Sequence, residues 1–207
     1  GQSAQIAAAD QVACVSSDAE SYLRSRFPSQ ANKIVVRKLG VPDLGGLAPH
    51  APGPPIRVIS VSSIDENKRV DLIASSITRL VQMGYPVEWN HFGDGPSREN
   101  LEAQIAGKPD GMSVRLHGQV SHSEIREELI SGGHHVFVNL SKSEGVPVSI
   151  IEAQCAGLPV VATDAGGSSE AAPHHLNEFV PVGTSPQGAA EAVLRVLAHN
   201  PSEARYR

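Results

Sequence analysis

The sequence has few aromatic residues, two cysteines, no excess of positive charge and no long apolar run. Aromatic residues make up 4% of the 207 residues, so a platform on which sugars or nucleic-acid bases stack is not expected. The formal net charge of −5 argues against the basic surface of a nucleic-acid-binding protein. No apolar run approaches the roughly 20 residues of a membrane-spanning helix. The composition, with 40% hydrophobic and 19% charged residues, is that of an ordinary globular protein.

Cysteine and histidine give no disulfide framework and no metal centre. Cys14 and Cys155 lie far apart in apolar stretches, so we expect two buried free thiols in a reducing compartment, with a bridge between them as the alternative. The histidine pairs 134–135 and 174–175 are neighbours in sequence. Neighbouring residues of a strand point to opposite faces, so no metal site is expected.

A stretch rich in proline and glycine divides the chain. Residues 42–55, PDLGGLAPHAPGPP, cannot form a regular element and predict a linker. Residues 1–41 show a strand–helix–strand pattern that is too short for a core, so we expect them to be the tail of an N-terminal domain. Residues 56–200 are expected to form one further domain, and residues 201–207 the start of a C-terminal tail.

Strands and helices alternate after the linker. Strands are expected at 56–63, 86–93, 112–118, 135–141, 158–163 and 177–182. Helices are expected at 68–83, 97–107, 121–131, 147–156 and 186–199. This alternation predicts an α/β fold, a Rossmann-like three-layer α/β/α arrangement with a parallel sheet of about six strands. In such a fold, ligands bind in the loops that lead from strand ends into helices.

Residues 143–167, SEGVPVSIIEAQCAGLPVVATDAGG, place two carboxylates at one such loop. The N–H groups of Val146 and Val148 are candidates for anion binding at a helix N-terminus. Glu144 comes just before them. Glu152 lies inside the helix, where its carboxylate could accept from two neighbouring hydroxyls of a ribose. Taken alone, the pattern fits equally well a helix-capping Glu144 and a solvated Glu152.

Three weaker signals lie in other loops. Lys68 follows the first strand of the domain and could neutralise a diphosphate, with Arg69 as a weaker candidate and a surface lysine as the alternative. Gly166-Gly167 allows close backbone approach, although a double glycine alone is better interpreted as a simple turn. The G-x-G of HFGDGPSREN has Arg98 where a nicotinamide fingerprint needs glycine, which argues against a dehydrogenase.

Together these signals carry a family resemblance. SEGVPVSIIEAQCAGLPVVATDAGGSSE resembles the signature of retaining glycosyltransferases of family 4, which have the B-type (GT-B) fold of two Rossmann-like domains. FGDGPSRENLE and VRLHGQVSHSEIREEL resemble two further segments of that family. The resemblance covers about residues 10–200 and corresponds to the C-terminal, donor-binding half. The form SEGVPVSI is similar to that of bacterial enzymes of surface-polysaccharide biosynthesis.

The resemblance implies roles for these residues. Lys68 and Glu144 would be catalytic, with Lys68 on the donor diphosphate and Glu144 facing the donor sugar. The implied donor-binding residues are Gly145, Val146, Pro147, Val148, Glu152, Arg69, Leu116, His117 and Gly118. Glu152 would bind the ribose, and the loop at Leu116 would lie near the base. The family often has an arginine shortly before the lysine, whereas Ser63 stands here, so one phosphate cation is missing.

The resemblance also implies an activity. It predicts a hexosyltransferase (EC 2.4) that moves a sugar from a nucleoside diphosphate-sugar, with UDP or GDP, to a saccharide or lipid-linked acceptor without a cofactor or metal. The missing N-terminal domain would bind the acceptor, so this chain alone should bind the donor with little or no transfer. The expected location is cytoplasmic, or peripheral to the inner membrane. The alternatives are a non-catalytic sugar-nucleotide-binding module and a sugar-nucleotide epimerase of the same fold, and E-G-x-P favours the transferase.

Overall fold

The computed structural model describes residues 1–49, 53–172 and 174–198. The elements in chain order are α1 (Gln2–Ala8), β1 (Val12–Cys14), α2 (Ser17–Arg26), the 3-10 helix η1 (Pro28–Lys33), β2 (Ile34–Val36), β3 (Ile56–Val61), α3 (Val70–Gln82), β4 (Val87–Phe92), α4 (Arg98–Ala106), β5 (Met112–Gly118), α5 (His122–Ser131), β6 (Val136–Asn139), α6 (Val148–Cys155), β7 (Val160–Thr163), the 3-10 helix η2 (His174–Leu176), β8 (Glu178–Val180) and α7 (Pro186–Ala198).

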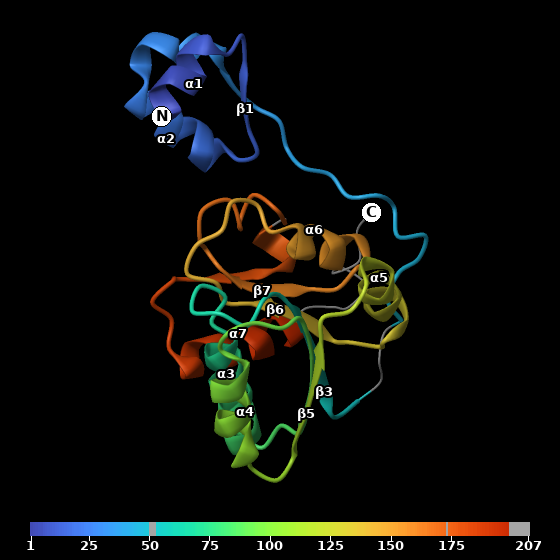
Figure 1. The fold of residues 1–207 in the computed structure, drawn as a ribbon. Coiled ribbons are helices and arrows are strands. Elements are labelled where there is room, and N and C mark those ends of the chain that lie inside the picture. The colour runs from blue at the N-terminus through green and yellow to red at the C-terminus, as the bar shows by residue number, and fades with distance from the viewer. Residues whose placement is uncertain (50–52, 173, 199–207) are drawn as a thin grey trace.

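Residues 56–198 are built around a six-stranded sheet in the order β5-β4-β3-β6-β7-β8. Every neighbouring pair of these strands is parallel. Helices α3, α4 and α7 pack on one face, and α5 and α6 on the other (Figure 1). The predicted α/β fold is therefore confirmed. The strand order reverses direction between β3 and β6, which makes that position the topological switch point of the sheet.

Two sequence patterns explain the layers. All four residues of β6 and all four of β7 are buried, as expected for strands covered by helices on both faces. Helix α3 buries Val70, Ile73, Ile77 and Leu80, which recur at helical spacing and form one apolar stripe. This stripe packs in the same core cluster as the buried alanines and valines of α7.

Helix ends follow the predicted signals with one correction. The helix expected at 121–131 starts with a capping box formed by Ser121 and Glu124. Gly157 has φ +77° just after α6, and the following Leu158 N–H donates to the Ala153 carbonyl at 2.9 Å. Pro147, predicted as the first helical residue, is instead the N-cap of α6, because its ψ of 111° is extended.

The N-terminal unit, residues 1–36, contains α1, β1, α2, η1 and β2, with β1 and β2 paired in parallel. In Figure 1 an extended stretch connects it to the sheet domain. The unit also touches that domain directly, because the Glu170 carboxylate accepts from the N–H groups of Ser17 at 2.8 and 2.9 Å and of Asp18 at 3.2 Å. The connecting stretch packs on the domain as well, since Ala48 is buried and its N–H donates to the Ala156 carbonyl.

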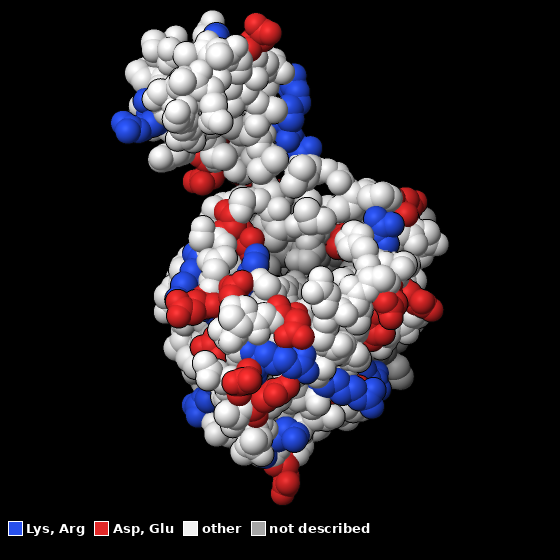
Figure 2. Space-filling model, in the orientation of Figure 1, with Lys and Arg blue, Asp and Glu red and all other residues white. Residues whose placement is uncertain are grey.

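Both cysteines are free thiols, as predicted, although Cys155 is only partly buried. Burial raises the pKa of both thiols. Among the helices that the structure describes, none has both the length and the apolar character that crossing a bilayer requires. Acidic and basic side chains are interspersed over the face shown in Figure 2, without a continuous basic field.

Candidate functional site

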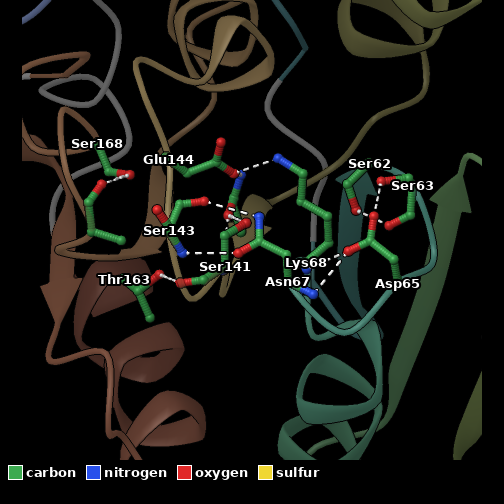
Figure 3. A network of polar contacts seen from close by, with 12 residues as sticks. Ser62, Ser63, Asp65, Asn67, Lys68, Ser141, Ser143, Glu144, Thr163 and Ser168 are labelled. Carbon is green, nitrogen blue, oxygen red and sulfur yellow. Dashed lines mark hydrogen bonds and ion pairs between the residues drawn. The ribbon is translucent and has the colours of Figure 1, made fainter. Parts of the chain in front are cut away.

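A lysine and a glutamate from two different loops meet at the switch point. Lys68 lies in the β3–α3 loop and Glu144 in the β6–α6 loop. Lys68 Nζ is 2.7 Å from Glu144 Oε1, and the two side chains point toward each other in Figure 3. The lysine side chain is 24% exposed and the glutamate 8%, so the pair is shielded but can still be reached. The structure therefore brings together the two residues predicted to be catalytic.

Asn67 fixes the distance between these two loops. Its Nδ2 donates to the Ser143 carbonyl at 3.0 Å, and its Oδ1 accepts from the Ser143 N–H at 3.1 Å (Figure 3). Its backbone carbonyl accepts from the Lys142 N–H at 2.7 Å. Three hydrogen bonds thus join the residue before Lys68 to the residues before Glu144.

Asp65 shapes the loop that carries Lys68. Its carboxylate accepts from the Ser63 hydroxyl at 2.5 Å and from the N–H groups of Asn67 and Lys68, both at 2.9 Å. These bonds, the Ser63 hydroxyl first, lower the pKa of Asp65. Ser63, which stands where the family often has an arginine, therefore supports the loop and supplies no cation.

Polar side chains beneath Glu144 form the floor of the site. Asn139, at the end of β6, is buried, and its Nδ2 lies 3.4 Å from Glu144 Oε1. Its Oδ1 accepts from both the N–H and the hydroxyl of Ser141. Thr163, at the end of β7, donates to the Ser141 carbonyl at 2.5 Å. The catalytic candidate thus lies above a network held by two adjacent strand ends.

The double glycine packs against the Glu144 loop. Gly167 N–H donates to the Gly145 carbonyl at 2.8 Å. A Cβ on Gly166, which has φ +55°, would lie 2.0 Å from the Glu144 carbonyl oxygen, and a Cβ on Gly167 would lie 2.2 Å from that of Gly145. Gly166 and Gly167 lie in a turn, as predicted, and this turn also makes the close backbone approach that residues without a side chain allow.

Arg69 is held away from the site. Its guanidinium donates to the carbonyls of Leu140 and Val182, both at 2.6 Å, and of Ser141 at 3.3 Å. Burial lowers the pKa of this guanidinium. Arg69 thus binds three strand-end carbonyls, and the structure does not bring it together with Lys68 as a phosphate-binding pair.

Glu152 is buried in α6. Its side chain is 3% exposed, with His122 Nε2 at 2.8 Å and Arg126 Nε at 3.9 Å from Oε1. The alternative of a solvated Glu152 was therefore wrong. Helix α6 is short and apolar around this position, and α5 contributes the two basic side chains.

The residues predicted to form a loop near a base, Leu116, His117 and Gly118, are instead the last three residues of strand β5, and His117 is exposed. The ring of His117 stacks on Phe92 with centroids 4.1 Å apart, and its Nε2 lies 2.8 Å from Asn90 Oδ1. Gly118 has φ +72°, and its carbonyl accepts from the Gly93 N–H at 2.8 Å. Leu116, just before them, is half-buried.

Residues 145–147 lead into α6, which begins at Val148. Gly145 and Val148 are exposed, Val146 is half-buried and Pro147 is buried. The first turn of a helix leaves its N–H groups without intrahelical partners. Pro147 has no backbone N–H group. Gly145 and Val148, whose N–H groups are candidates for binding an anion, are thus exposed residues that closely follow Glu144 in the chain.

Five residues that contact the predicted site residues or support their loops were missed from the sequence: Asp65, Asn67, Asn139, His122 and Arg126. The S-x-D-x-N order around Asp65 is a turn signal that could have indicated its part in the loop. Asn139, a polar residue closing a buried strand, was a second available signal. Nothing in the sequence pairs Arg126 with Glu152.

Within the described ranges, no cluster of three or more histidine, cysteine, aspartate or glutamate residues could hold a metal ion. His134 is buried, and its Nε2 lies 2.8 Å from Glu128 Oε1. His175 is exposed.

The chain is similar to known glycosyltransferases. One subunit of the human (Homo sapiens) phosphatidylinositol N-acetylglucosaminyltransferase is 34% identical over 121 residues, or 58% of this chain and 25% of that protein. Sucrose-phosphate synthase from Thermosynechococcus elongatus has a TM-score of 0.78 and 24% identity, covering 99% of this chain and 53% of its own. The pneumococcal O-GlcNAc transferase GtfA, in complex with UDP and GlcNAc, has a TM-score of 0.73 and 19% identity, covering 94% of this chain and 40% of its own.

These likenesses extend over only part of the relatives. The chain spans about a quarter of the human protein's length and about half or less of the two solved chains. The solved structures show a shared fold, the Rossmann-like arrangement of GT-B glycosyltransferases. A family model described as Glycosyl transferases group 1 matches residues 48–207, most of the chain, and the chain therefore belongs to that family.

Proposed function

We propose that the chain binds a nucleoside diphosphate-sugar at the switch point of its sheet and forms the donor site of a retaining, family 4 type hexosyltransferase. The observation that carries this proposal is the 2.7 Å contact between Lys68 and Glu144 in front of α6. Open α/β sheets bind ligands at this place. A lysine beside helix-terminal amides suits a diphosphate, and a carboxylate next to it suits the sugar.

Each residue then has a distinct task. In the empty site Glu144 neutralises Lys68. A bound diphosphate would take Lys68 and the amides of Gly145 and Val148, and it would leave Glu144 to accept hydroxyls of the sugar. Glu152, one turn and a half further into the helix, would bind the ribose diol.

The chemistry follows from where charge develops. Cleavage of the bond between the anomeric carbon and the diphosphate leaves negative charge on the diphosphate, which Lys68 and the α6 amides stabilise without a metal. The acceptor oxygen attacks from the face that the diphosphate leaves, and the departing phosphate takes the acceptor proton. Configuration is thereby retained. A trapped covalent glycosyl–enzyme adduct would contradict this mechanism.

UDP or GDP is the nucleotide that we propose, and a saccharide or lipid-linked glycan the acceptor. GtfA, which shares the fold, is described in complex with UDP, and the human relative's name includes phosphatidylinositol. Because the relatives are much longer than the matched part, we propose that the acceptor is bound by a further domain. The chain alone would then bind donor with little transfer, in the cytoplasm where sugar nucleotides are made.

Thermal unfolding with UDP, GDP and ADP tests the donor site. A ligand at 100 times its Kd adds about 2.7 kcal/mol to the free energy of unfolding, a shift of several degrees in Tm. We expect one diphosphate to give this shift, with or without EDTA. The shift should disappear in Glu152→Ala and persist in Glu99→Ala, a control on an exposed helical glutamate of α4. No shift with any nucleotide would contradict the proposal.

A further inference from the structure

The residues around Glu152 leave its carboxylate incompletely satisfied. Its Oε1 and the Nε of Arg126 are both buried, and neither makes a hydrogen bond of good geometry to any residue that the structure describes. Nε2 of His122, 2.8 Å from that oxygen, makes a close contact that is not an aligned hydrogen bond. A buried carboxylate in this state gains from any partner that donates along its lone pairs, as a hydroxyl can.

His122 is placed to leave this contact easily. It is the first residue of α5, whose start is fixed independently by the Ser121–Glu124 capping box. Its side chain is 58% exposed while Glu152 is 3% exposed, so the imidazole lies over the carboxylate at the protein surface. Rotation of His122 into solvent would uncover Glu152 without disturbing the helix or the core.

We propose that His122 occupies the position that a ribose hydroxyl would take on Glu152, and that it leaves when the donor binds. This inference rests on the proposed function, because it requires a ribose at Glu152. The imidazolium attracts the carboxylate more strongly than the neutral imidazole does. The donor therefore competes with a stronger partner at low pH, its binding releases a proton, and its affinity rises with pH.

Two further ionisable groups lie near Glu152. Arg126, on the same helix as His122, has its guanidinium Nε 3.9 Å from Glu152 Oε1. Cys155, on α6, has its thiol pKa raised by burial first and then by Asp43 and Glu152, so it stays neutral. Histidine is the residue type that changes charge near neutral pH, so we assign the pH dependence of donor binding to His122.

Calorimetric titration with UDP-glucose and GDP-mannose tests the inference. Both phosphates of these ligands are esterified and do not titrate in the range used, unlike the terminal phosphate of UDP. We expect the Kd of the sugar nucleotide that binds to fall about five- to tenfold from about pH 5.5 to about pH 7.5. In His122→Gln the change should be less than about twofold, with binding at the lower pH as tight as that of the wild type at the higher. His175→Gln, a control on another exposed histidine, should behave as the wild type.

The possible outcomes separate the two proposals. A pH dependence that persists in His122→Gln, for example one arising from His117, would overturn the role of His122 and leave the donor site intact. A wild-type affinity that does not change with pH would have the same meaning. Failure of both sugar nucleotides to bind at either pH would overturn the proposed function and this inference with it.

Discussion

At the scale of single residues, Lys68 is the cation that the structure places beside Glu144 at the candidate site. Arg69 is occupied by three backbone carbonyls, and Ser63 holds Asp65. Lys68 is paired with Glu144, so its ammonium is already positioned at the switch point before any ligand arrives. An anion bound there would meet a charge whose position the protein has fixed in advance.

Replacing Lys68 by methionine keeps the length of the side chain and removes its charge. A hydrogen bond to a charged group contributes about 1.5–3 kcal/mol, so we expect the Kd for UDP or GDP to rise about tenfold to about a hundredfold. Isothermal calorimetry measures this change. Lys108→Met, at an exposed lysine beyond α4, is the matched control. Equal affinities in all three proteins would remove Lys68 from the site.

The sequence predicted the charged residues of the candidate site and did not predict the residues that hold them in place. Lys68, Glu144 and Glu152 were found because their spacing resembles a family signature and their loops follow strands. Asn67 and Arg126 were missed, because each acts through a partner from another loop or helix, more than 20 residues away in the case of Arg126 and Glu152. Arg69 was predicted as a weaker candidate for binding the diphosphate. Its guanidinium instead donates to three backbone carbonyls, which come together only in the folded sheet.

At the scale of elements, the boundaries of the predicted strands and helices in the sheet domain agree with the structure to within two residues, except that the predicted end of the last helix, residue 199, lies outside the described residues. Buried strands and amphipathic helices have strong patterns, and glycines end the helices. The short helices α1 and η1 were not predicted. Helix α1 buries only Ile6 among its residues, so it has no apolar periodicity to detect.

The close approach of two loops at Gly166 can be tested by adding one methyl group. Gly166→Ala would place a Cβ 2.0 Å from the Glu144 carbonyl oxygen, at a φ of +55°. We expect the free energy of unfolding to fall by more than about 2 kcal/mol, measured by urea denaturation, together with a loss of donor binding. A Cβ on Gly183 would meet nothing within 4 Å, so Gly183→Ala should change the stability little. Similar stabilities of the two variants would contradict this account of the double glycine.

Strands β3 and β4 bury a histidine whose titration should make stability depend on pH. Burial lowers the pKa of His91 from 6.5 to about 4, and its Nδ1 lies 2.8 Å from the Ser60 hydroxyl. The unfolded chain takes up a proton near pH 6.5, whereas the folded protein does so near pH 4. Stability is therefore full above about pH 6.5 and falls as the pH decreases toward 4, and we expect a loss of about 2 kcal/mol at pH 5.

Urea denaturation at several pH values measures this effect. His91→Gln removes the titrating group, so its stability, although lower overall, should depend less on pH over the same range. His175→Gln, at an exposed site, should keep the dependence of the wild type. An unchanged pH dependence in His91→Gln would show that the proton is taken up elsewhere.

At the scale of the whole molecule, the N-terminal unit is attached to the sheet domain through Glu170. The amides at the start of α2, those of Ser17 first, lower the pKa of this carboxyl. The contact therefore stabilises the assembly above the carboxyl's ordinary pKa of 4.5 and is lost as the pH falls through the lower folded value.

Glu170→Gln should loosen the N-terminal unit without unfolding the sheet domain. We expect faster cleavage by a protease in the connecting residues 37–49, because the unit would separate more often from the domain. Glu127→Gln, at an exposed glutamate of α5, should leave the cleavage rate unchanged. Equal rates for Glu170→Gln and the wild type would mean that other contacts hold the unit.

The loop from residue 164 to residue 170 connects the N-terminal unit with the loop that carries Glu144. Its two glycines lie against the carbonyls of Glu144 and Gly145. Its Glu170 carboxylate accepts hydrogen bonds from the Ser17 N–H at the start of α2. Residues 164–170 thus contact the N-terminal unit at one end and, at the other, the backbone of Glu144, the residue that would face the sugar. We therefore expect a displacement of the N-terminal unit to be transmitted through residues 164–170 to the loop that carries Glu144.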